Sequence, residues 1–255
     1  MPSALTDPRA LARFYEAAVR LGIYSTTSNL RRHLRYLFDG VELRGQRLLD
    51  VGGGAGLLAV YAAVRGAEAV CVEPEAHGST SGVTAKFSQL RLAVGPQLAV
   101  ELVSAPIQDY LSTPRRFDVV VIANAINHLN EEACIRLRVD PAAQSAYQDL
   151  FSALFRALNP GGWLIATDCS SANFFSAIGV RSPFMPDIEW HKHQPPRVWD
   201  RLLQRCGFAP ATVRWSAPNT LGWLGRLVFG NRVAAYFVLS HFRLAARKPL
   251  SASPC

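Results

Sequence analysis

The sequence predicts an α/β fold in which a mostly parallel sheet of seven strands is covered by helices on both faces. Three observations support this prediction. Strand-like apolar runs alternate with helical ones from about residue 46, a cluster of glycines follows the first of these runs, and 49% of the 255 residues are hydrophobic. Alternation of this kind is typical of parallel sheets, and the hydrophobic content supplies a core large enough to cover one on both sides.

The first elements expected are helices. Over residues 7–38, apolar side chains such as Phe14 and Leu21 recur at helical spacing. We therefore expect an N-terminal helical cap over residues 1–45, followed by a larger domain over residues 46–255.

The alternating region contains the remaining elements. Helical patterns lie at 56–66, 80–93, 141–158 and 196–206. The strand-like runs are RLLDV (47–51), AVCVEP (69–74), QLAVELVSA (97–105), FDVVVIAN (117–124), GGWLIATD (161–168), ATVRW (211–215) and AAYFVLSHFRLAARK (234–248). Parallel neighbours need a crossover connection, and no clear crossover helix joins the last two runs. We therefore expect an antiparallel last strand, with residues 217–233 as an insertion before it.

Composition excludes several classes of protein. No apolar run reaches the ~18 residues of a membrane-spanning helix, and the N-terminus lacks the basic start and apolar core of a secretory signal. The five cysteines are scattered without a CxxC pair, which argues against disulfides or a zinc cluster and favours a cytoplasmic location. The net charge of +8 fits nucleic acid, an anionic membrane, an acidic substrate or simply an arginine-rich proteome.

The glycine cluster marks the expected ligand site. Residues 52–56 read Gly-Gly-Gly-Ala-Gly, between the run at 47–51 and a helical pattern. Ligands of open α/β sheets bind beyond the carboxyl ends of the strands, and glycines let backbone N–H groups face the ligand. A dinucleotide site needs G-x-G-x-x-G. The spacing here is G-x-G-x-G, which disfavours a nicotinamide oxidoreductase.

The stretch from Leu48 to Gly56 resembles motif I of the class I S-adenosylmethionine-dependent methyltransferases, whose pattern is apolar-apolar-D/E-x-G-x-G-x-G. Further stretches resemble the family in the same order along the chain. They are Glu73 at the end of the second strand, SAPIQDY (104–110), FDVVVIANAINHL (117–129) and LNPGGWLIATD (158–168). The resemblance covers about residues 45–170. It implies a Rossmann-like fold, S-adenosyl-L-methionine as the cofactor and S-adenosyl-L-homocysteine as the product.

The resemblance also implies a set of cofactor-binding residues. The Glu73 carboxylate would accept hydrogen bonds from both ribose hydroxyls, and Ile107 would contact the adenine ring. The family often has an acidic residue just before this isoleucine, where this chain has Pro106. Asp50 has a second interpretation, as a cap of the following helix. The full predicted set is Asp50, Gly52, Gly53, Gly54, Gly56, Glu73, Pro74, Ile107, Gln108 and Asn124.

Three histidines are candidates for a catalytic base. Methyl transfer needs an in-line nucleophile held close, and a base where the acceptor has a surplus proton. His128 follows the fourth strand, and His191 and His193 lie shortly before the helical pattern at 196–206. Imidazole ordinarily titrates near pH ~6.5, which suits a base. A metal site at the last two histidines would lack a companion cluster, so we expect no metal.

We therefore expect a methyltransferase that acts on an oxygen or nitrogen of a small, partly apolar molecule. Methyltransferases that act on exocyclic amines often resemble [ND]PP[YF] after the fourth strand. Residues 124–127 of this chain read NAIN, which disfavours that class. An RNA or protein methyltransferase, which the positive charge favours, and a non-catalytic S-adenosylmethionine-binding assembly protein remain alternatives. The apolar residues of 217–233 leave open a lid, a peripheral membrane contact or a homodimer contact, and a monomer also remains open.

Overall fold

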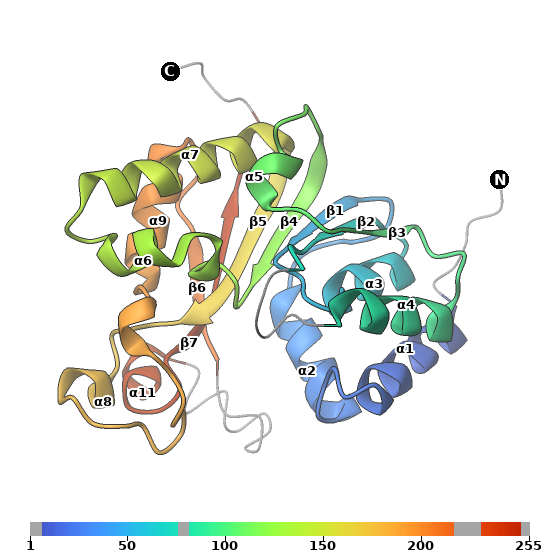
Figure 1. The fold of residues 1–255 in the computed structure, drawn as a ribbon, viewed down its shortest axis with the longest axis horizontal. Helices are drawn as coiled ribbons and strands as arrows, with labels where there is room; N and C mark the ends of the chain where they lie inside the picture. Colours follow the sequence, from blue (N-terminus) through green and yellow to red (C-terminus); the bar gives the residue numbers. More distant parts are fainter. Residues whose placement is uncertain (1–6, 76–81, 217–230, 251–255) are drawn as a thin grey trace. The chain divides into compact units, whose positions relative to one another are not determined.

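The computed structural model describes residues 7–75, 82–216 and 231–250 (Figure 1). These residues contain a sheet of seven strands and the helices that connect them. The chain divides into two units, Met1–Val121 and Ile122–Cys255. The first contains α1 (Pro8–Arg20), α2 (Thr27–Leu37), β1 (Arg47–Val51), α3 (Leu57–Val64), β2 (Glu68–Val72), α4 (Val83–Val94), β3 (Val100–Val103), α5 (Ile107–Tyr110) and most of β4 (Phe117–Ala123). The second contains η1 (His128–Asn130), α6 (Glu131–Arg136), α7 (Pro141–Ala157), β5 (Leu158–Cys169), α8 (Phe174–Ala177), η2 (Trp190–Lys192), α9 (Pro196–Arg205), β6 (Thr212–Trp215), α11 (Arg232–Phe237) and β7 (His241–Arg247).

The strand order is β3-β2-β1-β4-β5-β7-β6. This order, with helices between the parallel strands, confirms the predicted seven-stranded α/β fold. Among the described residues, no helix combines the length and the apolar character needed to cross a bilayer.

Local signals set the starts of the N-terminal helices. The Asp7 carboxylate accepts a hydrogen bond from the Arg9 N–H at 2.9 Å, and Pro8 follows it in the first turn of α1. The Thr26 hydroxyl caps α2 in a similar way. The buried face of α1 packs against α3 and α4. The N-terminal helices are thus present, whereas the domain boundary predicted at residue 45 stays a prediction.

The parallel strands of the first unit bring the ends of β1 and β2 to one edge. β1 pairs with β2 and β4, and Asp50 and Val51 stand opposite Cys71 and Val72. Leu48 to Val51 are all buried, as expected of an inner strand covered on both faces. The glycine loop after β1 and Glu73 after β2 are therefore neighbours.

The second unit is built on β5, β7 and β6. β7 runs antiparallel to both of its neighbours, which confirms the predicted antiparallel last strand. α7 and α9 pack together around the fully buried Trp199, whose ring lies 5.1 Å from that of Tyr147 and 6.1 Å from that of Phe151.

The prediction of a strand at 234–248 is wrong over its first residues. Residues Arg232–Phe237 form α11, and β7 begins only at His241. A short apolar run fits either a strand or a buried helix. The deciding local signal is Asn231, whose side chain accepts a hydrogen bond from the Ala234 N–H at 2.9 Å and caps the helix. Residues 217–230, most of the predicted insertion, lie outside the described residues.

Candidate active site

The glycine loop after β1 has one packed side and one open side. A Cβ added to Gly53 would lie 2.7 Å from the Cys71 Sγ and closer still to the Asp50 carboxylate, so the loop can pack here only through a glycine. Gly54 has a φ of +53°, and nothing lies within 4 Å of its Cβ position. The open side leaves room for a ligand directly against the backbone.

Glu73 follows β2 beside this loop. Its Oε2 accepts a hydrogen bond from the Gly54 N–H at 2.9 Å, and the residue is only 7% exposed. Within the described ranges, Oε1 has no hydrogen-bond partner. A ribose hydroxyl can donate to this second oxygen, so the chemistry of the loop and carboxylate fits the predicted cofactor.

Asp50 lies buried beneath the loop. Its Oδ2 accepts a hydrogen bond from the Ala59 N–H at 3.2 Å, and so caps α3, whose own N-cap residue, Gly56, has no side chain. Its Oδ1 is buried without a partner among the described residues. Burial raises the pKa of Asp50 to about 7, the Ala59 hydrogen bond opposes this rise, and the charge of Glu73 adds to it. The capping role is thus observed, and a cofactor contact by Asp50 stays a prediction.

We expect the Asp50 carboxyl to make the protein less stable as the pH rises toward neutrality. The folded-state pKa of about 7 lies above the ordinary value of 3.8, so the folded protein holds this proton more tightly than the unfolded chain does. The stability contributed by the group is full below pH 3.8 and is lost as the pH passes through about 7. Asp50→Asn keeps an oxygen acceptor for the helix but cannot titrate. Urea unfolding from pH ~5 to pH ~8 should therefore show wild type losing stability relative to this variant, and a constant difference would contradict the assignment.

The other residues predicted in the first unit lie in this loop, directly after Glu73 or at the start of α5. Pro74 follows Glu73 directly and is half-buried. Ile107 is buried at the start of α5, and Gln108 beside it is exposed. Their contacts with the cofactor, including that of Ile107 with adenine, stay predictions. The Gly52 N–H donates to the Val72 carbonyl at 2.8 Å, which ties the start of the loop to β2.

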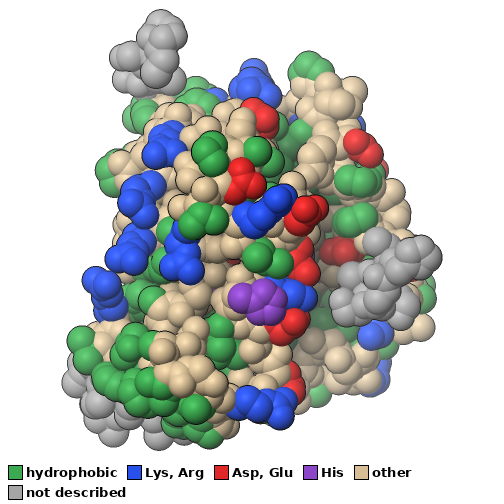
Figure 2. All heavy atoms as spheres, turned by 60° about the vertical axis from the view of Figure 1, so that its left-hand side comes forward, with side chains coloured by type: hydrophobic (Ala, Val, Ile, Leu, Met, Phe, Trp, Pro, Cys, Tyr) green, Lys and Arg blue, Asp and Glu red, His purple; other side chains and the backbone are tan. Residues whose placement is uncertain are grey.

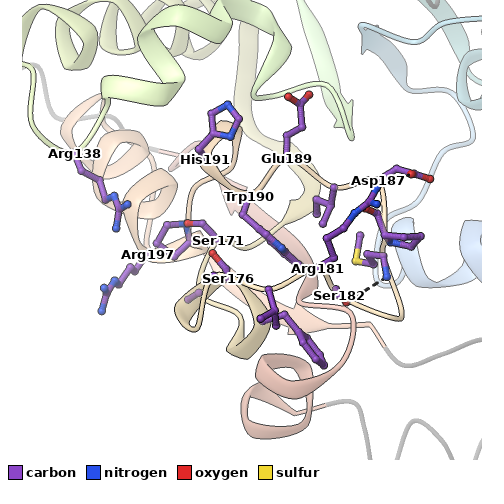
Figure 3. Close-up of a pocket in the computed structure, with 18 residues that line it drawn as sticks. Arg138, Ser171, Ser176, Arg181, Ser182, Asp187, Glu189, Trp190, His191 and Arg197 are labelled. Carbon is purple, nitrogen blue, oxygen red and sulfur yellow. Dashed lines mark hydrogen bonds and ion pairs between the residues drawn. The ribbon is translucent and has the colours of Figure 1, made fainter.

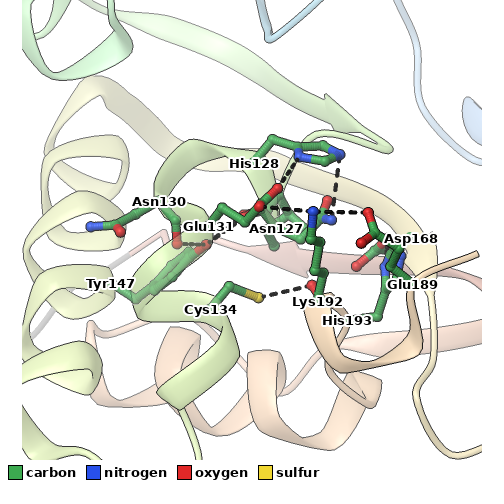
Figure 4. A network of polar contacts seen from close by, with 11 residues as sticks. Asn127, His128, Asn130, Glu131, Cys134, Tyr147, Asp168, Glu189, Lys192 and His193 are labelled. Atoms are coloured by element: carbon green, nitrogen blue, oxygen red, sulfur yellow. Dashed lines mark hydrogen bonds and ion pairs between the residues drawn. The ribbon is translucent and has the colours of Figure 1, made fainter.

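In the second unit, a buried carboxylate at the end of β5 meets one of the three predicted histidines. Asp168 is 2% exposed, and its Oδ1 lies 2.9 Å from the Nδ1 of His193 (Figure 4). The His193 side chain is 15% exposed. With Nδ1 directed at the carboxylate, Nε2 is the nitrogen that can take up a proton. A histidine oriented by an acidic partner is one arrangement that general-base catalysis uses.

Lys192 fixes the segment that carries His193. Its ammonium lies 2.8 Å from the Glu189 carboxylate and 3.0 Å from that of Glu131 (Figure 4). These hydrogen bonds raise the pKa of Lys192, and the bond from Lys192 lowers the pKa of each glutamate. All three groups are therefore charged at neutral pH. The Cys134 Sγ also donates to the Lys192 carbonyl at 3.3 Å, so η2 is joined to α6 by side chain and backbone.

The other two predicted histidines have different surroundings. The Nδ1 of His128 lies 3.2 Å from the Glu131 carboxylate, and its side chain is 60% exposed. His191 is exposed and lines a separate pocket. Of the three, His193 alone has a buried carboxylate partner. Among the described residues, no group of three His, Cys, Asp or Glu side chains gathers as metal ligands would.

Asn124 holds the turn after β4. It has a φ of 53°, in the left-handed region. Its N–H donates to the Thr167 carbonyl at 2.8 Å, and its Oδ1 accepts from the Nε2 of His241 at 2.9 Å and from the Thr167 hydroxyl at 3.3 Å. These bonds fasten the end of β4 to β5 and β7, while the predicted cofactor contact of Asn124 stays a prediction.

Sequence reasoning missed three charged residues of this network: Asp168, Glu131 and Lys192. One signal was available for Asp168, because it ends the strand-like run at 161–168 and ligands of α/β sheets bind at carboxyl ends. No sequence pattern pairs Glu131 with Lys192, which are brought together by the path of the chain between α6 and η2.

The chain is similar to a known protein family and to individual enzymes. The family profile described as "Methyltransferase domain" matches residues 24–213. The ubiquinone biosynthesis O-methyltransferase of Azotobacter vinelandii is 29% identical over 136 residues, which cover 52% of this chain and 54% of that protein. The enzyme of the same name from Pseudomonas putida strain F1 is 30% identical over 146 residues, with the same coverage. The matched stretch thus spans about half the length of these curated relatives.

Solved structures share the fold. An S-adenosylmethionine-dependent methyltransferase from Mesorhizobium loti has a TM-score of 0.55 and 18% identity, over 85% of this chain and 96% of that chain. Phosphoethanolamine N-methyltransferase 2 of Haemonchus contortus, in complex with S-adenosyl-L-methionine, has a TM-score of 0.57 and 18% identity, over 94% of this chain and 57% of that chain. At this identity the likeness shows the fold alone.

Proposed function

We propose, from the premise that this chain belongs to the family of S-adenosylmethionine-dependent methyltransferase domains, that it methylates an oxygen or nitrogen of a small, partly apolar molecule. The family match covers residues 24–213, which include the glycine loop, Glu73, Asp168 and His193. The observation that carries the catalytic part of the proposal is the 2.9 Å contact between His193 Nδ1 and the buried Asp168 carboxylate.

The first unit supplies the cofactor-binding residues of the proposal. When bound, S-adenosyl-L-methionine supplies an electrophilic methyl group on a sulfonium. The open side of the loop at Gly54 admits the ligand to the backbone, and the Oε1 of Glu73 accepts from a ribose hydroxyl. The hydrogen bond between Glu73 and the Gly54 N–H holds that carboxylate in place before the ligand arrives.

The second unit supplies the base. The Asp168 carboxylate keeps the Nδ1 of His193 as the donor nitrogen, so that Nε2 takes the proton from an acceptor hydroxyl or N–H. Asp168 then stabilises the imidazolium that forms, because opposite charges attract strongly at a buried site. Lys192, held by Glu131 and Glu189, keeps the histidine-bearing segment in place.

The named relatives support a small-molecule acceptor. Two of them are ubiquinone biosynthesis O-methyltransferases, and another is a phosphoethanolamine N-methyltransferase. His193 serves either an oxygen or a nitrogen acceptor wherever that acceptor has a proton to lose.

The direct test is calorimetric titration of the protein with S-adenosyl-L-methionine, S-adenosyl-L-homocysteine and NAD. We expect saturable binding of the two sulfur compounds and none of NAD. Release of S-adenosyl-L-homocysteine is then measured with phenols, carboxylates, amines and RNA as acceptors. Turnover with a small molecule supports the proposal, whereas turnover with RNA alone favours the RNA alternative. Binding without turnover on any acceptor favours the non-catalytic one.

A further inference from the structure

The second unit contains a pocket that the proposed function does not use. It has a volume of about 830 Å³ and lies among the loop after α8, η2 and the start of α9 (Figure 3). That volume falls in the ~300–1,000 Å³ range of small-molecule sites. Neither Asp168 nor His193 lines it, and of the predicted site residues only His191 does.

Each acidic side chain of the pocket has a basic side chain near it. Asp187 lies 4.0 Å from Arg181, and Glu189 lies 2.8 Å from Lys192. These pairs offset part of the negative charge that would repel an anion, and Arg181 is engaged in one of them.

Two arginines of the pocket remain available. Arg138 precedes α7, and Arg197 lies in the first turn of α9. Within the described part of the chain, neither guanidinium has an ion-pair partner or a side-chain hydrogen bond. Figure 3 shows both on the same side of the pocket, with Ser171 and Ser176 close by. Guanidinium and hydroxyl groups on one side of a pocket are donors suited to a carboxylate or a phosphate.

The positive charge extends beyond this pocket. Arg138 also lines a neighbouring hollow of about 320 Å³, together with Arg201 and Arg205. Arg197, Arg201 and Arg205 are spaced by four residues and so lie along one face of α9. The space-filling view of this side of the molecule shows a run of basic side chains with few acidic ones among them (Figure 2). A field of one sign raises the local concentration of anions.

Part of the pocket wall is apolar. Phe175, Val180, Met185 and Trp190 line it. A free inorganic anion would leave these side chains without contacts, whereas a ligand with an apolar body would cover them.

We propose that this pocket binds an amphipathic anion, whose carboxylate or phosphate is held by Arg138 and Arg197 and whose apolar body packs on Phe175, Val180 and Trp190. Neither His193 nor Asp168 lines this pocket. The inference therefore stands or falls separately from the proposed methyl transfer.

The test uses three probes that share one ring system. Binding of 1-naphthyl phosphate, 1-naphthoate and uncharged 1-naphthol to the full chain is measured by calorimetry. We expect at least one of the anions to bind about tenfold or more tightly than the alcohol, because only the anions form charge-assisted hydrogen bonds. Which anion binds better distinguishes a phosphate site from a carboxylate site. Equal affinity for all three probes would overturn the proposal.

Variants of the arginines complete the test. The double variant Arg138→Gln and Arg197→Gln should lose about tenfold in affinity for the preferred anion and leave the naphthol affinity unchanged. A double variant of Arg9 and Arg20, both exposed on α1 and both changed to Gln, removes the same charge and should leave binding intact. Equal loss in the two double variants would mean that only net charge matters, which contradicts the site. The single variants, each expected to lose part of the affinity, provide the same comparison should the first double variant not fold. In all of them S-adenosyl-L-methionine affinity should stay at the wild-type value.

Discussion

Replacing His193 with alanine should lower turnover by about 10²–10⁴-fold, the range that a positioned general base contributes. The affinity for S-adenosyl-L-methionine should stay near the wild-type value, because His193 is not among the residues proposed to bind the cofactor. Steady-state kinetics with the acceptor found by screening, together with calorimetric titration of the cofactor, measure the two quantities separately.

Matched variants distinguish a catalytic role of His193 from a structural one. His128→Ala and His191→Ala remove the same side chain from exposed positions and should keep turnover near wild type. Asp168→Asn should lower turnover and change its pH profile, since it removes the charge that orients the base. Added imidazole should restore part of the activity of His193→Ala. Full turnover of that variant would leave positioning of the acceptor as the only catalytic device.

Replacing Glu73 with alanine should weaken S-adenosyl-L-methionine binding by about 1–3 kcal/mol, the range for losing hydrogen bonds to a charged group. Each 1.4 kcal/mol corresponds to about a tenfold higher Kd. The substitution also removes the acceptor of the Gly54 N–H, so the loop loses the contact that orders it. Calorimetric titration of the folded variant measures the change.

The control for this prediction lies on the same strand. Glu68 begins β2, opposite the end that Glu73 follows, and its side chain is 75% exposed. Glu68→Ala should therefore bind the cofactor like wild type. Equal affinities of Glu73→Ala and wild type would remove the ribose contact from the proposed site.

The sequence was most informative where local signals agree with tertiary burial. β1 coincides with the predicted run at 47–51, because an inner parallel strand is apolar along its whole length. α7 begins at Pro141, as predicted, after a capping aspartate. It ends at Ala157, one residue before the predicted end at 158. The glycine spacing likewise identified the loop whose packing requires Gly53.

The sequence was least informative where distant segments meet. His193 was one of three candidates, because its distinction is a contact with Asp168, 25 residues away in the chain. The contact between His193 and Asp168 forms because the loop after β5 returns to the end of that strand. No periodicity in the sequence predicts the path of that loop. The strand predicted over the residues of α11 was wrong for a local reason. The composition of that run is strand-like, but the Asn231 side chain caps a helix there.

The position of β7 has a consequence for how the chain folds as it is synthesised. Among the described strands β7 is the last to be made, yet it lies between β5 and β6 and pairs with both. Until residues 241–247 leave the ribosome, β6 lacks the partner that joins it to β5. His241, which fastens the turn at Asn124, arrives in the same step. The second unit is therefore completed late and in one step, through contacts between residues far apart in the chain, and contacts of that kind form slowly. A nascent chain that ends before residue 241 contains every proposed catalytic residue, but it lacks the strand that holds the end of β5, and with it Asp168, in the sheet.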